Sequence, residues 1–135
     1  MGGQRRYRRA LGSRVMLRLP PRSPAERATI ARARARLDRL AFYPRPVSIR
    51  HVRIVHTPWL FRIPGFRRFH GYEFGPLILI RRPLREVSDD LIVHELCHVW
   101  QCQHRHVRMW VSYLYRGYRN NPHEVEARRA VALTR

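Results

Sequence analysis

The chain has 135 residues, a length that predicts one compact domain with its own hydrophobic core. It contains 28 arginines, no lysine and nine acidic residues, which give a formal net charge of +19. This charge favours nucleic acid, anionic membrane surfaces or acidic partners through long-range attraction. No apolar run approaches the ~20 residues that a membrane span needs, and the basic N-terminus lacks a continuous apolar stretch. We therefore expect no transmembrane segment and a cytoplasmic location.

The two cysteines, Cys97 and Cys102, also bear on the compartment. If both lie on one helix, a separation of five residues places their Cα atoms roughly 8–9 Å apart, which exceeds the reach of a disulfide. We expect two free thiols, as is usual in a reducing compartment.

The N-terminal segment, residues 1–22, contains seven arginines and no acid, and Pro20-Pro21 stands close to its end. This composition predicts a flexible basic arm that is either simply solvated or binds an anion. Residues 23–135 are predicted to form the folded domain.

The first predicted helix runs from residue 23 to about residue 41. Ser23-Pro24-Ala25-Glu26 is a capping box with proline at the first helical position. The buried stripe of this helix is predicted to consist of Ile30, Ala33, Leu37 and Leu40. Arginines occupy the other positions, and we interpret them as a solvated face, with nucleic-acid contact as the alternative.

The middle of the chain predicts two strands, and its end predicts helices. Residues 47–55 alternate and 76–80 form an apolar run, whereas 57–75 are rich in Pro, Gly and aromatics and are predicted to be irregular. Helices are predicted over residues 89–105, 107–115 and 122–133. Ser88-Asp89-Asp90 caps the first of them, and Asn121-Pro122 starts the last. The fold class is therefore expected to be α+β.

His94-Glu95-Leu96-Cys97-His98 has the H-E-x-x-H pattern of zinc peptidases. Four residues on a helix place His94 and His98 one turn apart, so that both imidazoles can reach one Zn²⁺ ion. Glu95 lies 100° around the helix, where it can touch a metal-bound water and act as general base. The apolar residues of this segment fall on the opposite arc, so the histidines are not predicted to face the core.

A catalytic zinc site needs a third protein ligand, and three residues compete for this role. His104 has the spacing of the long metzincin motif, but that motif requires Gly where this chain has Gln101, which would continue the helix. Glu124 could come from the last helix, although it could instead close a capping box with Asn121. Glu126 is its neighbour and could also hold a ligand imidazole. Five of the nine acids lie near these segments, and this clustering favours a cation site; they are Asp89, Asp90, Glu95, Glu124 and Glu126.

Residues 94–101 resemble the HELxHVxQ helix of small bacterial metallopeptidase-like domains of unknown function, and residues 115–128 resemble their GYxxNPxExEA segment. These domains are similar to zincins whose third ligand is a glutamate in an E-x-x-A-D context (gluzincins). The resemblance covers roughly residues 71–130 and implies Glu124 as the third ligand. It also implies a minimal zincin-like fold, in which the strand near Leu77–Ile80 is the edge that pairs with an extended peptide. Arg128 is a departure, because zincins carry Asp at this position.

The resemblance implies a zinc-dependent metallopeptidase-like hydrolase that acts on a peptide or protein. Zn²⁺ bound by His94, His98 and Glu124 would activate water, with Glu95 as general base. A further donor should stabilise the oxyanion, and Tyr118 is preferred over Tyr113 and Tyr115 because it borders the ligand segment. The alternative is a basic nucleic-acid-associated protein, binding nucleic acid or another polyanion, with a structural or catalytically degenerate zinc site.

Overall fold

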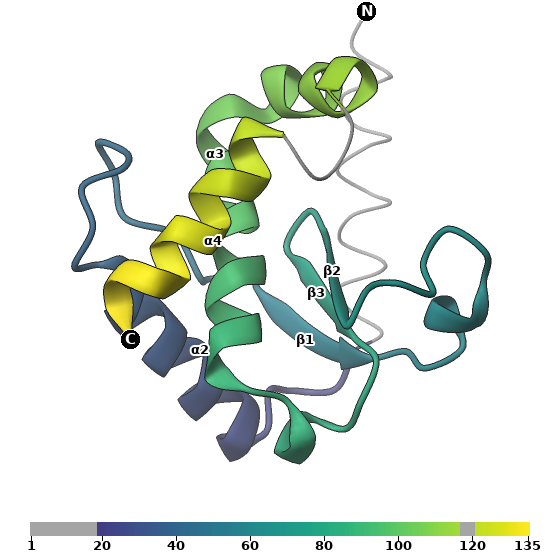
Figure 1. Cartoon of the computed structure of the whole chain (residues 1–135). Coiled ribbons are helices and arrows are strands. Elements are labelled where there is room, and N and C mark those ends of the chain that lie inside the picture. The colour runs from purple at the N-terminus through teal and green to yellow at the C-terminus, as the bar shows by residue number, and fades with distance from the viewer. Residues whose placement is uncertain (1–18, 117–120) are drawn as a thin grey trace, which may run out of the picture.

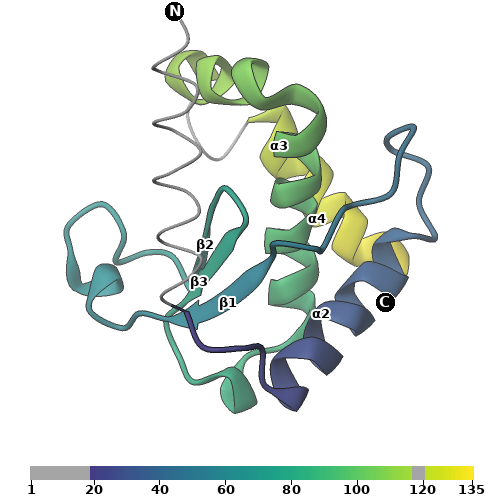
Figure 2. The same ribbon diagram turned by 180° about the vertical axis from the view of Figure 1, so that it is seen from behind.

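The computed structural model describes residues 19–116 and 121–135, and the chain within them forms three α-helices and one three-stranded sheet. The long helix α3 runs through the centre of the molecule, with the sheet on one side and α2 and α4 on the other (Figures 1 and 2). The α+β class is thus confirmed. The elements are α2 (Pro24–Leu37), β1 (Arg53–His56), η1 (Leu60–Arg62), β2 (Gly71–Phe74), β3 (Leu77–Ile80), η2 (Leu84–Glu86), α3 (Asp89–Arg116) and α4 (Pro122–Thr134).

None of the helices in the described ranges is both long enough and apolar enough to cross a membrane.

The sheet has the strand order β1-β3-β2, so β3 is its central strand. β1 pairs with β3 in parallel, and β2 pairs with it in antiparallel orientation. The expectation that Leu77–Ile80 is an edge strand is therefore wrong: Ile78 and Ile80 are fully buried, and neighbours lie on both sides. Another strand, β2, forms within the segment predicted to be irregular, and β1 is shorter than predicted because it begins only at Arg53.

Helix boundaries differ from the prediction in two places. α2 ends at Leu37 rather than near residue 41, because the N–H groups of Arg39 and Leu40 bond only three residues back, to Arg36 and Leu37, and the chain leaves the helix. α3 is one helix of 28 residues, not two. No glycine or proline occurs between residues 89 and 116, so nothing in the backbone chemistry forces a break.

The core forms where the apolar face of α3 meets the other elements. The predicted arc Ile92, Leu96, Val99 and Trp100 is buried, and the indole N–H of Trp100 donates to the carbonyl oxygen of Arg45 at 2.7 Å. The stripe predicted for α2 is buried at Ile30, Ala33 and Leu37, while Leu40 packs partly buried against the core.

Several arginines of α2 form ion pairs, which corrects the interpretation of a simply solvated face. Arg32 pairs with Asp89 at 3.0 Å, and Arg36 pairs with Asp90 at 2.8 Å. Arg39 donates to the carbonyl oxygen of Thr134. These contacts attach α2 and the residues just after it to the start of α3 and to the end of α4, and they engage both aspartates that were counted toward a cation site.

The predicted N-terminal arm lies mostly outside the described residues, which begin at residue 19. Its last part is hydrogen-bonded to the rest of the chain: Arg22 donates to carbonyl oxygens of the segment before β1, those of Ile49, Arg50 and Val52.

Candidate metal centre

Two imidazoles project from neighbouring turns of α3. The Nε2 atoms of His94 and His98 lie 3.2 Å apart, and the rings meet edge to face at 81°. His98 is buried, whereas His94 is partly exposed and lines an open pocket. The four-residue spacing thus brings two ring nitrogens close enough to share one cation.

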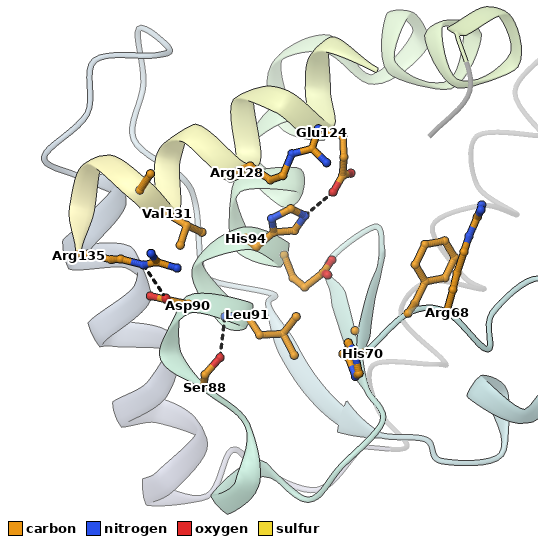
Figure 3. Close-up of a pocket in the computed structure, with 14 residues that line it drawn as sticks. Arg68, His70, Ser88, Asp90, Leu91, His94, Glu124, Arg128, Val131 and Arg135 are labelled. Carbon is orange, nitrogen blue, oxygen red and sulfur yellow. Dashed lines mark hydrogen bonds and ion pairs between the residues drawn. The ribbon is translucent and has the colours of Figure 1, made fainter. Parts of the chain in front are cut away.

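Glu124 reaches this pair from the first turn of α4. Its Oε1 lies 2.6 Å from Nε2 of His94, and its Oε2 lies 3.0 Å from Nε2 of His98. Asn121 caps the helix, because its side-chain oxygen accepts from the N–H of His123. The carboxylate of Glu124 points across to α3 (Figure 3), where its two oxygens contact the two imidazoles.

His94, His98 and Glu124 are the group of potential metal-binding side chains within the described residues, with ligand atoms within 4.8 Å of one another. Tetrahedral zinc with ligands at ~2.0–2.1 Å separates neighbouring ligand atoms by ~3.3 Å. The two Nε2 atoms, 3.2 Å apart, are near that value, while each of them contacts a different oxygen of the Glu124 carboxylate, at 2.6 Å for His94 and 3.0 Å for His98. Two imidazole nitrogens and one carboxylate oxygen are also a donor set that zinc accepts, with one position left for water.

Gln101 holds His98 from behind. The Nδ1–H of His98 donates to Oε1 of Gln101 at 2.7 Å, and the Gln101 amide N–H₂ donates to the carbonyl oxygen of His123 and to Glu126. Because the amide nitrogen has two acceptors, its oxygen faces the imidazole. The proton of neutral His98 is then kept on Nδ1, and the lone pair of Nε2 is directed at the position that a metal ion would occupy.

The other two candidates for the third ligand lie elsewhere. Glu126 accepts hydrogen bonds from the hydroxyl group of Tyr43 and from Gln101. It therefore supports the His98 imidazole through Gln101 and not by the direct contact that had been predicted. His104 donates through Nδ1 to the carbonyl oxygen of Trp100 at 3.0 Å, and its ring stacks on Tyr43. Neither residue belongs to the group that could hold a metal.

Glu95 is buried, at 5% exposure, and lines the pocket together with His94 and Glu124. Burial raises the pKa of its carboxyl group, against the opposing influence of the two imidazoles. Gly71 on β2 makes room for this side chain, because a Cβ atom there would lie 3.3 Å from Cγ and Oε1 of Glu95. The edge strand β2 therefore lies directly against the predicted general base.

The charges of the cluster depend on each other. Burial alone would raise the pKa of Glu124, but its hydrogen bonds to His94 and His98 lower it far below the usual range. Burial alone would lower the pKa of His98, but the hydrogen bond to Glu124 and the charge of Glu95 raise it to about 9. The buried carboxylates thus require a positive partner, which is a proton on His98 when no metal ion takes its place.

A third buried carboxylate lies nearby on β2. Glu73 is 8% exposed and accepts a hydrogen bond from the thiol of Cys102 at 3.6 Å. Burial raises the pKa of its carboxyl group to about 7. Both Cys97 and Cys102 are free thiols, as predicted.

His94 and Glu124 line a cavity of about 590 Å³ between α3, α4 and the segment before β2 (Figure 3). Arg68, Phe69 and His70 form one wall, and Arg128 and Val131 of α4 form another. His94 and Glu124 can therefore be approached from solvent, whereas His98 is buried behind them. His51, His56 and His70 are exposed, and none of them belongs to the ligand group.

Tyr118, the predicted oxyanion donor, lies outside the described residues, and the side chains of Tyr113, Tyr115 and His106 also lie outside them. The sequence missed Gln101 and Gly71 as contributors to the site. Gln101 had a detectable signal, since it stands three residues after His98 on the same helix face. Gly71 had none, because its role depends on how the sheet packs on α3.

Comparison of the chain with models of protein families, with curated proteins and with solved structures returned no match in any of the three.

Proposed function

We propose that the chain is a zinc-dependent hydrolase with a zincin-like site, and that it cleaves peptide bonds. The observation that carries this proposal is the convergence of His94, His98 and Glu124, two of which, His94 and Glu124, line the open pocket together with Glu95. Three protein ligands and an accessible fourth position are typical of catalytic zinc, whereas structural zinc is usually enclosed by four protein ligands.

In this proposal, zinc supplies Lewis acidity to a water molecule and to the carbonyl oxygen of the substrate. Glu95 accepts the proton of the attacking water and delivers it to the leaving amine. Its burial supports this role, because a raised pKa lets the carboxyl group hold the proton between the two transfers. Gln101 keeps His98 oriented through its hydrogen bond to Nδ1.

The edge that receives an extended peptide is then β2 rather than β3. Pairing with the exposed backbone of an edge strand is a known mode of peptide recognition. β2 lies at the edge of the sheet, and its first residue, Gly71, contacts Glu95. A peptide that adds to β2 would pass close to the metal ligands.

The alternative is a nucleic-acid-associated protein with a structural or degenerate zinc site, and the net charge of +19 favours it. The structure weakens one part of that case, because Arg32, Arg36 and Arg39 are engaged in contacts within the chain. A steep loss of nucleic-acid affinity with rising salt, together with no hydrolysis, would favour this alternative.

Metal analysis of the purified protein tests the proposal. Wild type should carry zinc close to one equivalent, His98→Ala and Glu124→Ala should lose it, and the exposed-histidine control His51→Ala should retain it. Glu95→Gln should keep zinc and lose cleavage of a casein or peptide-library substrate. Equal zinc content in all variants would refute the ligand assignment, and full turnover by Glu95→Gln would remove Glu95 as the base.

A further inference from the structure

The segment between β1 and β2, residues 57–70, forms a lobe at the side of the sheet away from α4 (Figures 1 and 2). It contains the 3-10 turn η1, and Phe61 of that turn is fully buried. Successive side chains of a 3-10 helix point about 120° apart, and side chains three residues apart lie on the same side. With Phe61 directed inward, the sides that carry Trp59 and Ile63 face outward. Arg62 lies on the same side as Trp59.

The exposure of these side chains agrees with that geometry. Trp59 is 62% exposed and Ile63 is 44% exposed, and residues 64–65, a Pro-Gly pair, are exposed as well. The backbone of the turn is hydrogen-bonded: the N–H of Arg62 donates to the carbonyl oxygen of Trp59 at 3.2 Å, and the N–H of Ile63 donates to that of Leu60 at 3.1 Å. The large apolar side chains are thus presented to solvent by a formed turn.

The lobe is also basic. Residues 57–70 contain three arginines and no acidic residue. Arg62 and Arg67 are exposed, and neither takes part in the ion pairs found in the described part of the chain. The guanidinium group of Arg67 donates to the carbonyl oxygen of Arg62 at 3.1 Å, and this neutral acceptor leaves its charge in place. Exposed apolar side chains and positive charge therefore occur together on the lobe.

We propose that the lobe docks the protein onto an anionic lipid surface. Trp59 and Ile63 enter the headgroup region, and Arg62 and Arg67 lie at the lipid phosphates. Tryptophan favours the boundary between membrane and water, arginine keeps its charged end in water while its stem covers apolar surface, and anionic lipids attract basic residues. This inference does not rest on the proposed function. Because residues 68–70 of the lobe line the cavity, docking would hold the cavity close to the lipid.

Two other partners fit this surface less well. A stable protein interface buries about 800 Å² on each side, which is large for a tip that carries two exposed apolar side chains. Single-stranded nucleic acid could stack a base on Trp59 and place phosphates at the arginines, but stacking uses flat rings. Ile63 and Pro64 have no such ring, and they gain more from contact with lipid chains.

Vesicles of phosphatidylcholine, with and without phosphatidylglycerol, are the probe, and sedimentation with the full chain measures affinity. Wild type should bind the mixed vesicles more tightly. Trp59→Ser and Ile63→Ser should each weaken this binding about tenfold, because each removes an apolar side chain from the lipid. Leu133→Ser is the matched control, since it removes an exposed apolar side chain from α4 and should leave binding unchanged.

The arginines of the lobe are tested in the same assay. Arg62→Gln should weaken binding to the mixed vesicles about fivefold, as is typical for one basic residue at an anionic surface. Arg129→Gln removes the same charge from an exposed position on α4 and should cost less, because α4 lies on the other side of the molecule (Figure 1). All of these side chains are exposed, so the variants should fold, and thermal unfolding checks that they do.

Insertion of Trp59 distinguishes docking by the lobe from adsorption through net charge. Phosphatidylcholine that carries bromine near the top of its acyl chains quenches tryptophan fluorescence on contact. When it is included in the mixed vesicles, it should quench part of the wild-type emission. This quenching should be lost in Trp59→Phe, which keeps an aromatic ring and should still bind.

Four results would overturn the inference. Absence of wild-type binding to the mixed vesicles refutes it. Equal weakening by Trp59→Ser and Leu133→Ser would mean that the lobe is not the apolar contact. Unchanged quenching in Trp59→Phe would place another part of the chain in the lipid. Quenching of Trp59 by a single-stranded oligonucleotide, without binding to the mixed vesicles, would assign the lobe to nucleic acid instead.

Discussion

Two pairs of carboxylates near α3 differ in their partners. Asp89 and Asp90, in the first turn, are partly exposed and pair with arginines at 2.8–3.0 Å. Glu95 and Glu124 are buried, and the positive groups that act on both are the imidazoles of His94 and His98. The chain thus uses the same chemical group for two purposes, at the start of α3 and at the contact between α3 and α4.

The difference lies in what the partner can do. A guanidinium group remains charged at every accessible pH, so the aspartates are neutralised permanently and serve to join helices. An imidazole can release its proton, so the glutamates can exchange that proton for a metal ion. In a chain with 28 arginines and nine acids, the placement of two histidines against Glu124 is what distinguishes the candidate metal site from a structural ion pair.

The largest expected effect is a loss of zinc affinity when one buried carboxylate is replaced by its isosteric amide. The same replacement in the partly exposed pair serves as the control. Glu124→Gln removes the anionic ligand and should weaken zinc binding by more than the ~100-fold upper end for residues that only support a ligand. Asp90 lines the same pocket, but its side chain is paired with Arg36 and Arg135 and not with the histidines. Asp90→Asn should therefore leave zinc affinity nearly unchanged. Competition with a chromophoric chelator measures both, and an equal loss in the two variants would contradict the comparison.

The pH dependence of metal binding follows from the exchange of proton for metal. The pKa of His98 is raised to about 9, and that of Glu124 is lowered, so the metal-free protein near neutral pH carries the proton on His98. Metal must displace this proton, and zinc affinity should therefore fall about tenfold for each unit below pH 9, or about 100-fold from pH 8 to pH 6. Calorimetry in buffers of different ionisation enthalpy should show release of about one proton at pH 7. Binding that does not vary with pH would refute the coupling.

The sequence was a good guide wherever the signal is local. Capping residues located the starts of α2, α3 and α4. The H-E-x-x-H spacing placed two ring nitrogens together, because helix geometry alone brings residues four apart onto one face. Glu124 could be selected over Glu126 only through resemblance, since both lie within the first turns of the same helix.

The rest depends on long-range packing. Strands of four residues carry little information about their neighbours, so the central position of β3 could not be predicted from its apolar run. The role of Gln101 depends on where α4 brings the His123 carbonyl oxygen and Glu126. The partners of Arg32 and Arg36 likewise lie more than fifty residues away along the chain.

Substitution of Gln101 tests whether zinc binding depends on the hydrogen bond that orients the His98 imidazole. Gln101→Leu removes the acceptor of the His98 Nδ1 proton, and it should weaken zinc binding by about 10–100-fold, as is usual for residues that orient a ligand. Gln103→Leu is the matched control, because that side chain is exposed and bonds to the backbone of Ser48. Gln101→Glu should restore part of the affinity, since it again accepts from Nδ1. If Gln101→Leu bound zinc as tightly as the control, the hydrogen bond would have no role in orienting the ligand.

The smallest expected effect concerns the arginine-paired carboxylates, and it tests their structural role. Asp90→Asn removes the charge that joins α3 to Arg36 of α2 and to Arg135 at the end of the chain. The Asp90 side chain is 36% exposed, so water and salt screen these pairs, and Tm should fall by only a few degrees at low salt. The difference from wild type should shrink at high salt, because screening weakens the pairs in the unmodified protein. Thermal unfolding at both salt concentrations measures this. A fall in Tm that is independent of salt would mean that Asp90 acts through packing or helix capping rather than through its charge.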